Sequence, residues 1–175
     1  MSYVDNNLIS GEKVLYKTGL HWVVLLGPAV VGGFFGLTGL ALLIGSMREK
    51  NDSARELAAA GSFLMVVAAA CIFAGIIRRK GTEMAVTNKR VIIKTGLLRR
   101  RTFELLLSKV ESIGVEEGLM GRMFGYGSVV VRGTGGTPEP FANVGHPLEF
   151  RRQVQQQIEA SDQKQNSFKG ELINA

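Results

Sequence analysis

Clustered lysine and arginine side chains are the feature of this chain best suited to binding a ligand. Nine of them lie within residues 78–101, and Glu83 is the one acidic residue among them. A basic cluster of this kind attracts anionic lipid head groups, and each side chain contributes about 1 kcal/mol when it lies near a membrane surface. For Arg78, Arg79 and Lys80, which directly follow an apolar run, the alternative is an anchor that only orients the chain across a membrane.

Six further cations flank two expected strand turns, one at Asn88 and one at Gly96. They are Lys89, Arg90, Lys94, Arg99, Arg100 and Arg101. Hairpin geometry can bring the last four together around one loop, which makes this group a candidate site for lipid phosphate or another acidic partner. The alternative is a basic hairpin that is only solvated. Nucleic acid is a weaker interpretation, because no aromatic residues that would stack on bases are interleaved with the basic run.

Residues that carry catalysis are sparse. The two histidines are His21 and His146, Cys71 is the single cysteine, and residues 78–161 contain no aspartate. These side chains assemble no catalytic triad, no metal-ligand cluster and no redox pair. We therefore expect a protein that is not an enzyme and uses no metal or cofactor. A single cysteine also excludes an intramolecular disulfide, which is consistent with a reducing compartment.

Two uncharged apolar runs, residues 22–44 and 57–77, are long enough to cross a membrane as helices. At about 1.5 Å per residue they reach roughly 31 to 35 Å, against a hydrocarbon core of about 30 Å. The first contains 13 Val, Leu, Ile and Phe residues; the second has nine and is rich in alanine, so we expect it to insert as the returning arm of a hairpin. The alternative, two buried helices of a soluble protein, would need a larger core than 175 residues normally build. A cleaved signal peptide is not expected, because the first run exceeds a signal peptide's apolar core and a second run follows it.

All of the net positive charge lies after the second run. Residues 1–77 carry five basic and five acidic residues, whereas residues 78–175 carry 16 and 10, which accounts for the whole net charge of +6. Basic residues near span ends concentrate on the cytoplasmic side of a membrane. We therefore expect residues 1–21 and the main domain, residues 78–160, to be cytoplasmic, with an external loop at residues 45–56 and both termini inside.

Small residues indicate how the two apolar helices pack. Gly32 and Gly36 form a Gly-x-x-x-Gly pattern, and Ala70 with Ala74 offers a matching small face on the second helix. The partner of each face is either the other arm of the same chain, which we favour, or another subunit.

The segment after the second run is rich in Val, Ile, Leu and Thr and is divided by turn residues, which is typical of short strands. The expected strands cover residues 83–87, 90–95, 99–107, 110–115, 128–132 and 137–144. Pro147 suits the first position of a helix, and Phe150, Val154 and Ile158 then recur every four residues. These elements predict a small β-barrel or sandwich capped by one C-terminal helix. The polar tail, residues 161–175, is expected to be disordered.

An apolar loop at residues 118–127 has two interpretations. It contains Leu119, Met120, Met123, Phe124 and Tyr126 around Arg122. It can dip into a bilayer, or it can fold back as a plug that fills one end of the barrel. We favour the plug, because small barrels need large side chains at their open ends.

Several longer motifs occur in a fixed order. They are Gly-Glu-Lys-Val-Leu-Tyr at residues 11–16, Thr-Glu-Met-Ala-Val-Thr-Asn-Lys-Arg-Val-Ile-Ile-Lys-Thr-Gly-Leu-Leu-Arg-Arg-Arg-Thr at 82–102, Ser-Lys-Val-Glu-Ser-Ile at 108–113, Gly-Arg-Met-Phe-Gly-Tyr-Gly-Ser-Val-Val-Val at 121–131 and Gly-Thr-Gly-Gly at 133–136. In this order the chain resembles the bacterial pleckstrin-homology-like (PH-like) membrane proteins, in the short form with two transmembrane helices and one PH-like domain. The resemblance implies a seven-stranded, helix-capped domain on a membrane hairpin. It supplies no ligand and no catalytic residues.

These observations lead to three functional hypotheses. The leading one is a non-enzymatic, multi-pass protein of the bacterial cytoplasmic membrane that presents its PH-like domain at the cytoplasmic face to bind anionic lipid or a protein. The alternative is an oligomeric scaffold or an assembly subunit that binds another membrane protein. A small transporter or channel is weaker, because neither apolar run carries an ionisable residue that would mark a path.

Overall fold

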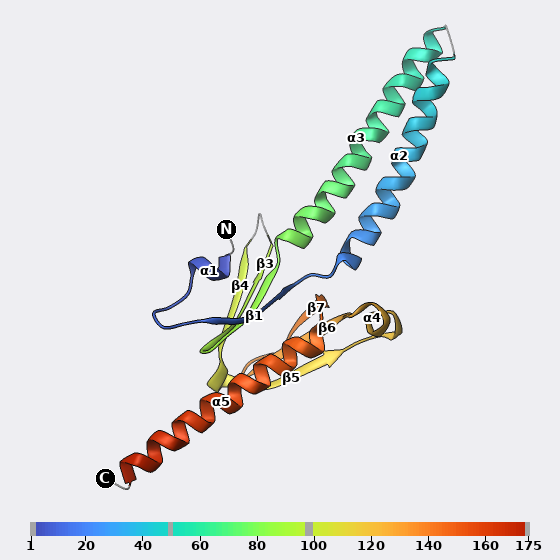
Figure 1. Cartoon of the computed structure of the whole chain (residues 1–175). Helices are drawn as coiled ribbons and strands as arrows, with labels where there is room; N and C mark the ends of the chain where they lie inside the picture. The colour runs from blue at the N-terminus through green and yellow to red at the C-terminus, as the bar shows by residue number, and fades with distance from the viewer. Residues whose placement is uncertain (1–2, 49–50, 97–99, 174–175) are drawn as a thin grey trace. The chain divides into compact units, whose positions relative to one another are not determined.

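The chain forms two compact units. A computed structural model describes residues 3–48, 51–96 and 100–173. Trp22–Arg79 forms one unit, called here the helical unit, and Met1–His21 together with Lys80–Ala175 forms the other, called the β-unit. Both are drawn in Figure 1. The helical unit is therefore an insertion within the sequence of the β-unit.

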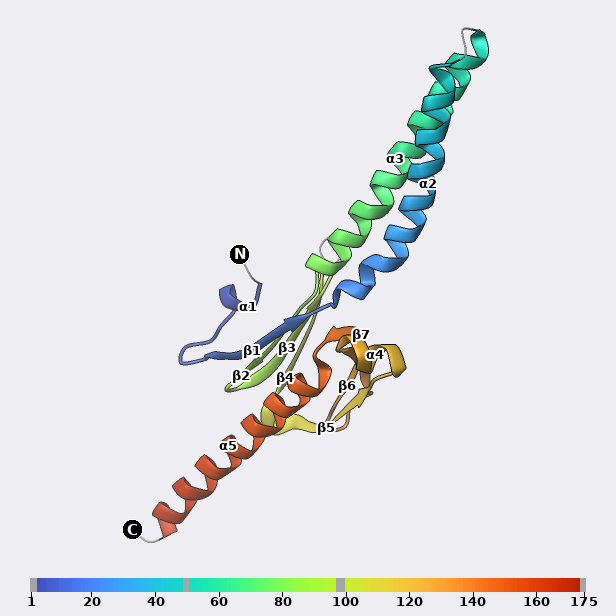
Figure 2. The ribbon, with the colours of Figure 1, turned by 45° about the vertical axis from the view of Figure 1, so that its right-hand side comes forward.

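The helical unit is a hairpin of two long helices. A short 3-10 turn, η1 (Trp22–Leu25), leads into α2 (Leu26–Ser46), and the chain returns through α3 (Asp52–Lys80). The two helices lie side by side in both views of the ribbon (Figures 1 and 2). By length and composition, Trp22–Ser46 and Asp52–Lys80 can each cross a membrane. The predicted spans lie within these helices, and the connection between them is shorter than the loop predicted at residues 45–56.

Small residues at seven-residue spacing bring α2 and α3 together. Gly32 and Gly39 on α2 are buried, as are Gly61, Ala68 and Gly75 on α3. A Cβ atom added at Gly39 would lie 2.9 Å from the carbonyl oxygen of Gly61, and one added at Gly61 would lie 2.8 Å from that of Gly39. The backbones therefore approach closely, with the spacing used by helices that pack in a left-handed coiled coil.

On α2 the contact uses the glycine face that we predicted, whereas on α3 it uses a face other than the predicted alanine pair. Gly32 lies in the contact, and a Cβ at Gly36 would lie 3.7 Å from the Cβ of Ala68. Ala70 and Ala74, however, are exposed. Ala70 follows Ala68 by two residues and so points about 200° away from it around the helix. The intrachain partner of the glycine face is the 61, 68, 75 series, not the predicted alanine pair.

The β-unit contains two antiparallel sheets. The first has the order β1 (Val14–Gly19), β2 (Glu83–Thr87), β3 (Arg90–Thr95), β4 (Arg101–Leu106); the second has the order β5 (Val110–Glu116), β6 (Tyr126–Gly133), β7 (Glu139–Gly145). The helical elements are α1 (Tyr3–Asn6), the 3-10 turn η2 (Leu107–Lys109), α4 (Leu119–Phe124) and α5 (Pro147–Ile173). Seven strands and a C-terminal helix confirm the predicted class of β-domain.

One strand, β1, lies where we expected only a separate N-terminal segment. Its side chains alternate between partly buried and exposed positions. Tyr16 packs on the core between the sheets, and Val14, beyond a register shift, packs on the outer face of the first sheet. It pairs with β2 from Val14 opposite Thr87 to Gly19 opposite Glu83. The PH-like domain is therefore not limited to residues 78–160, because residues 1–21 supply part of its first sheet.

The core lies between the two sheets and α5. Met84, Val86, Val91 and Ile93 of the first sheet meet Val129, Val131 and Val144 of the second, and Phe150 and Val154 of α5 complete the cluster. An isolated bridge between Leu20 and Val144 joins the end of β1 to β7. Phe150 and Val154 are fully buried, so the stripe that predicted the capping helix is the face that packs on the barrel.

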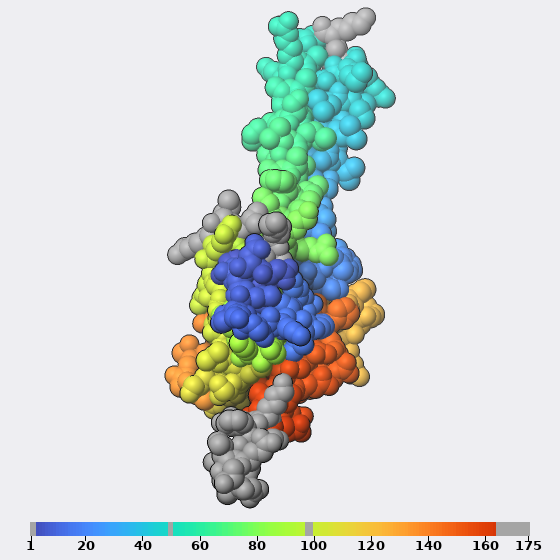
Figure 3. Space-filling view, turned by 60° about the vertical axis from the view of Figure 1, so that its left-hand side comes forward, coloured from blue at the N-terminus to red at the C-terminus, as the bar shows by residue number. Residues whose placement is uncertain are grey.

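The N-terminal segment covers the outer face of the first sheet. Val4 of α1 packs with Ala85 and Ile92, and Leu8 and Val14 border this second cluster. Figure 3 shows the N-terminal segment in dark blue over the strands of this sheet. Because both faces of β2 and β3 are covered, these strands read as nearly continuous apolar runs.

The last helix is longer than predicted. We expected residues 161–175 to be disordered, but α5 continues to Ile173. Residues 159–169 are mainly Glu, Gln, Lys, Asp, Ser and Asn without proline, so that nothing in this stretch interrupts the helix.

Candidate functional site

The register of the first sheet separates the predicted cations into two groups. Gly19, Glu83, Lys94 and Thr102 stand in one row across its four strands. We call this the junction end, because here the chain leaves β1 for the apolar helices and returns into β2. Arg90 lies at the opposite end of the sheet, where it pairs with Leu106.

Arg90 is occupied by internal partners. Its Nη2 lies 3.0 Å from Oε2 of Glu12 and donates to the carbonyl oxygen of Asn7 at 2.8 Å, while its Nη1 lies 2.6 Å from Oε2 of Glu104. The neighbouring Lys89 is exposed, and its Nζ donates to the carbonyl oxygen of Ser10 at 2.9 Å. Arg90 therefore fastens the N-terminal segment to the sheet, and its position does not favour a role in binding a ligand.

The carboxylate of Glu12 is the buried member of this ion pair. Its side chain is 0% exposed. Burial alone would raise the pKa of Glu12, but hydrogen bonds from the backbone N–H of Ile9, the hydroxyl of Thr87 and the guanidinium of Arg90 outweigh it, and the charge of Arg90 adds to their effect. The pKa of Glu12 consequently lies below its ordinary value, so the pair is charged at neutral pH.

At the junction end, the cations differ in their exposure. Lys94 is buried, with its Nζ 3.9 Å from Oε1 of Glu83 and 5.6 Å from the centre of the Tyr3 ring. Arg100 is exposed, and Arg101 is 75% exposed although it pairs with Glu139 at 3.1 Å. Arg99 lies outside the described residues. Arg100 and Arg101 are thus presented to solvent, while Lys94 is covered beside Tyr3 of the N-terminal segment and Glu83.

Three more cations directly precede this end in the chain. Arg78, Arg79 and Lys80 form the last residues of α3, and all three are exposed. Only Gly81 and Thr82 separate them from β2. In the sequence, the predicted anchor residues therefore directly precede the strand that begins at the junction end.

The second sheet contributes α4 to the same end of the β-unit. The ring of Tyr126, at the start of β6, stacks on the ring of His21 with centroids 5.4 Å apart. The backbone N–H of His21 donates to the carbonyl oxygen of Asn143 at 2.8 Å, and the hydroxyl of Thr18 donates to that of Gly145 at 2.7 Å. α4 ends two residues before Tyr126, and so it lies near the last residues of β1 within the β-unit.

The apolar side chains of α4 do not plug the barrel. Leu119 is 93% exposed and Met123 is 66% exposed, and Met120 and Phe124 are exposed as well. The buried residue of this helix is Gly121, where a Cβ atom would overlap the carbonyl oxygen of Tyr126. Gly121 thus allows α4 to pack closely on β6, with the large side chains of the helix facing outward. The plug interpretation was therefore wrong.

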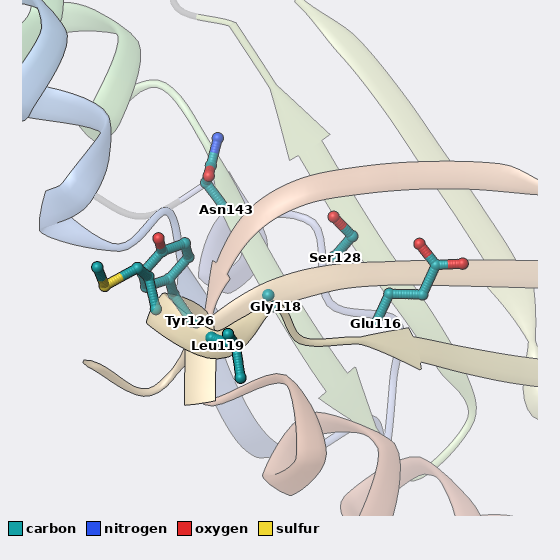
Figure 4. Close-up of a pocket in the computed structure, with 9 residues that line it drawn as sticks. Glu116, Gly118, Leu119, Tyr126, Ser128 and Asn143 are labelled. Atoms are coloured by element: carbon teal, nitrogen blue, oxygen red, sulfur yellow. The ribbon is translucent and has the colours of Figure 1, made fainter. Parts of the chain in front are cut away.

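A pocket of about 390 Å³ lies beside α4. Figure 4 shows residues of its lining, among them Glu116 and Ser128, which are paired across β5 and β6. The remaining lining residues are Gly118, Met120, Gly121, Gly127 and Asn143. Its lining combines apolar side chains with a few polar groups, and among the described residues no group of three His, Cys, Asp or Glu could hold a metal ion.

Comparison with known proteins identifies the family. Residues 27–158 match the family model described as bacterial PH domain, so this chain belongs to that family. The matched region contains most of α2, all of α3, β2 to β7 and the first part of α5. The predicted resemblance is confirmed. Searches of curated proteins and of solved structures gave no match.

Proposed function

We propose that this chain is a non-enzymatic integral membrane protein that holds its PH-like domain at the cytoplasmic face of the bacterial cytoplasmic membrane, where the junction end contacts anionic lipid. In this proposal α2 and α3 span the bilayer and both termini are cytoplasmic. The exposed cations Arg100 and Arg101, together with Arg78, Arg79 and Lys80, face the head groups.

The exposure of the hairpin supports a lipid environment. In the most apolar windows of Trp22–Ser46 and Asp52–Lys80, 11% and 17% of the residues are buried. Leu37 is 73% exposed, and Val30, Phe34, Phe63 and Val66 are similarly uncovered. Helices in the core of a soluble protein would be mostly buried, whereas contiguous exposed apolar surface of this extent favours contact with lipid or a partner.

The observation that carries the proposal is the shared location of the basic turn and the chain connections to the hairpin. The row of Gly19, Glu83, Lys94 and Thr102 places the β3–β4 turn at the end of the sheet from which both apolar helices are reached. In this proposal a domain tethered through this end has that turn near the membrane surface, and the cations that come within roughly 8 Å of the surface are attracted by its potential.

An oligomeric scaffold remains the second candidate, because one feature of the hairpin favours it. Ala70 and Ala74 are exposed on α3 at the four-residue spacing that allows helices to approach closely. A second copy of the chain would fit there. Crosslinking of full-length protein in native membranes that yields only monomers would count against this candidate.

A linked domain tests the lipid contact. Because Gly19 and Glu83 are paired, a short Gly-Ser linker can replace residues 22–79 and join the two parts of the β-unit. Replacing Arg99, Arg100 and Arg101 with Gln in this linked domain is expected to weaken its binding to phosphatidylglycerol vesicles by up to about two orders of magnitude, since each cation contributes about 1 kcal/mol. Cosedimentation at several salt concentrations measures the effect, which salt should reduce.

A matched control removes charge at other sites. Lys89, Lys109 and Arg132 are exposed and belong to other turns or strands, and their replacement with Gln should change vesicle binding much less. Equal losses from both triple variants would indicate attraction by net charge alone. No loss from either would contradict the lipid-binding proposal.

A further inference from the structure

We infer that α4 is a second membrane contact, whose exposed apolar side chains insert into the interfacial region of the bilayer that α2 and α3 span. This inference rests on the proposed function, because it requires the hairpin to be in lipid. It adds a defined apolar contact to the electrostatic one at the β3–β4 turn.

The geometry of α4 selects which side chains would insert. Gly121 faces β6, since a Cβ there would overlap the carbonyl oxygen of Tyr126. At about 100° per residue, Leu119 and Met123 lie roughly 160° from Gly121 in either direction. Both therefore point directly away from the β-unit, and Leu119 is its most exposed large apolar side chain.

The place of α4 in the β-unit argues for lipid as the occupant of this face. His21, whose ring stacks on Tyr126, is followed in the chain by Trp22, the first residue of the apolar segment. A side chain next to the point where the chain enters the bilayer is at the level of the head groups. Trp and Tyr are the residues enriched at that level.

The charges around this end also favour lipid over a protein partner. Arg122 is exposed on the flank of α4, and Arg100, Arg101 and Lys80 are exposed at the junction end. A short helix with an apolar outer face and flanking cations is the composition of an interfacial anchor, in which the cations reach the phosphates while the apolar face enters the acyl boundary. An anionic bilayer satisfies both features at once.

Single-cysteine labelling of the full-length protein tests the inference. Single cysteines are introduced in a Cys71→Ala background and labelled with an environment-sensitive fluorophore. Leu119→Cys and Met123→Cys test α4, and Leu37→Cys in α2 is the control inside the proposed span. Thr134→Cys, exposed in the β6–β7 turn at the other end of the second sheet, is the aqueous control. The protein is reconstituted in vesicles of phosphatidylethanolamine and phosphatidylglycerol, with or without lipids brominated near the top of the acyl chain.

Labels at positions 119 and 123 are expected to emit at shorter wavelength than the label at 134 and to lose roughly half or more of their emission to brominated lipid, as fits a face about 5–10 Å into the interface. The inference is overturned if these labels stay water-exposed while the label at 37 is quenched. It is also overturned if their emission shifts without quenching, which would indicate a protein surface. An unquenched label at 37 would overturn the proposed function itself.

Discussion

A fragment of residues 80–175 is expected to lack a stable fold, whereas the linked domain, which adds residues 1–21, is expected to unfold cooperatively. The missing residues supply β1, with Val14 and Tyr16, and the buried side chain of Val4, which packs on Ala85 and Ile92. Each large apolar side chain that is lost or uncovered costs about 1.5–3 kcal/mol. Together these approach the whole stability of a domain, about 5–15 kcal/mol.

Thermal unfolding followed by circular dichroism compares the two proteins. The linked domain should show one sigmoidal transition, and the shorter fragment should show none or a broad one at much lower temperature. Equal transitions in both would mean that residues 1–21 are not part of the folding unit, and would contradict the fold described above.

Replacing Arg90 with Met should destabilise the linked domain by about 3–5 kcal/mol, because it leaves the carboxylate of Glu12 buried without its cation. Adding Glu12→Gln should recover part of the loss, since the uncompensated charge is then removed. The matched control is Arg101→Met. That residue also pairs with a glutamate but is 75% exposed, so its replacement should cost about 1 kcal/mol or less.

Urea unfolding at neutral pH measures these differences. A loss from Arg90→Met no larger than that from Arg101→Met would show that the buried pair does not hold the N-terminal segment. If the Arg90→Met, Glu12→Gln double variant is as unstable as Arg90→Met alone, the loss of stability arises from packing and not from the uncompensated charge of Glu12.

The same pair gives the domain an acid sensitivity. The pKa of Glu12 in the folded protein lies below its ordinary value of 4.5, so its carboxylate stabilises the fold fully above that value. This contribution is lost as the pH falls through the folded pKa. The urea midpoint of the linked domain should therefore decline at acidic pH, and the decline should be smaller in the Glu12→Gln variant.

Much of the β-unit could be predicted from local pattern. The short apolar strands divided by turn residues after the second apolar run, and the stripe of Phe150 and Val154, are local features, and the structure contains them. β1 was not predicted, because it has only six residues and its partner strand β2 lies more than sixty residues away in the sequence, beyond both apolar helices. The motif at residues 11–16, noted only as part of a resemblance, was the signal that marked it.

The candidate site was harder to predict, because it depends on which basic side chains form ion pairs with acidic residues elsewhere in the chain. Arg90 and Lys94 belong to the basic run in the sequence, but Glu12 and Glu83 pair with them in the structure. The partner of Arg90 comes from the segment before the hairpin, which no local pattern reveals. For α4, the exposed orientation follows from Gly121 and its contact with Tyr126, and apolar composition alone suggested the opposite.

We propose that a membrane-spanning hairpin is inserted between two paired strands, β1 and β2, of a cytoplasmic PH-like domain. Labelling of single cysteines with a membrane-impermeant maleimide in bacterial spheroplasts tests it most directly, with Cys71→Ala as the background. Asn51→Cys lies in the connection between α2 and α3, and Ser108→Cys is exposed in η2 of the β-unit. We expect position 51 to be labelled in intact spheroplasts and position 108 to be labelled only after permeabilisation. Labelling of position 108 from outside, or protection of position 51 until the cells are opened, would contradict it.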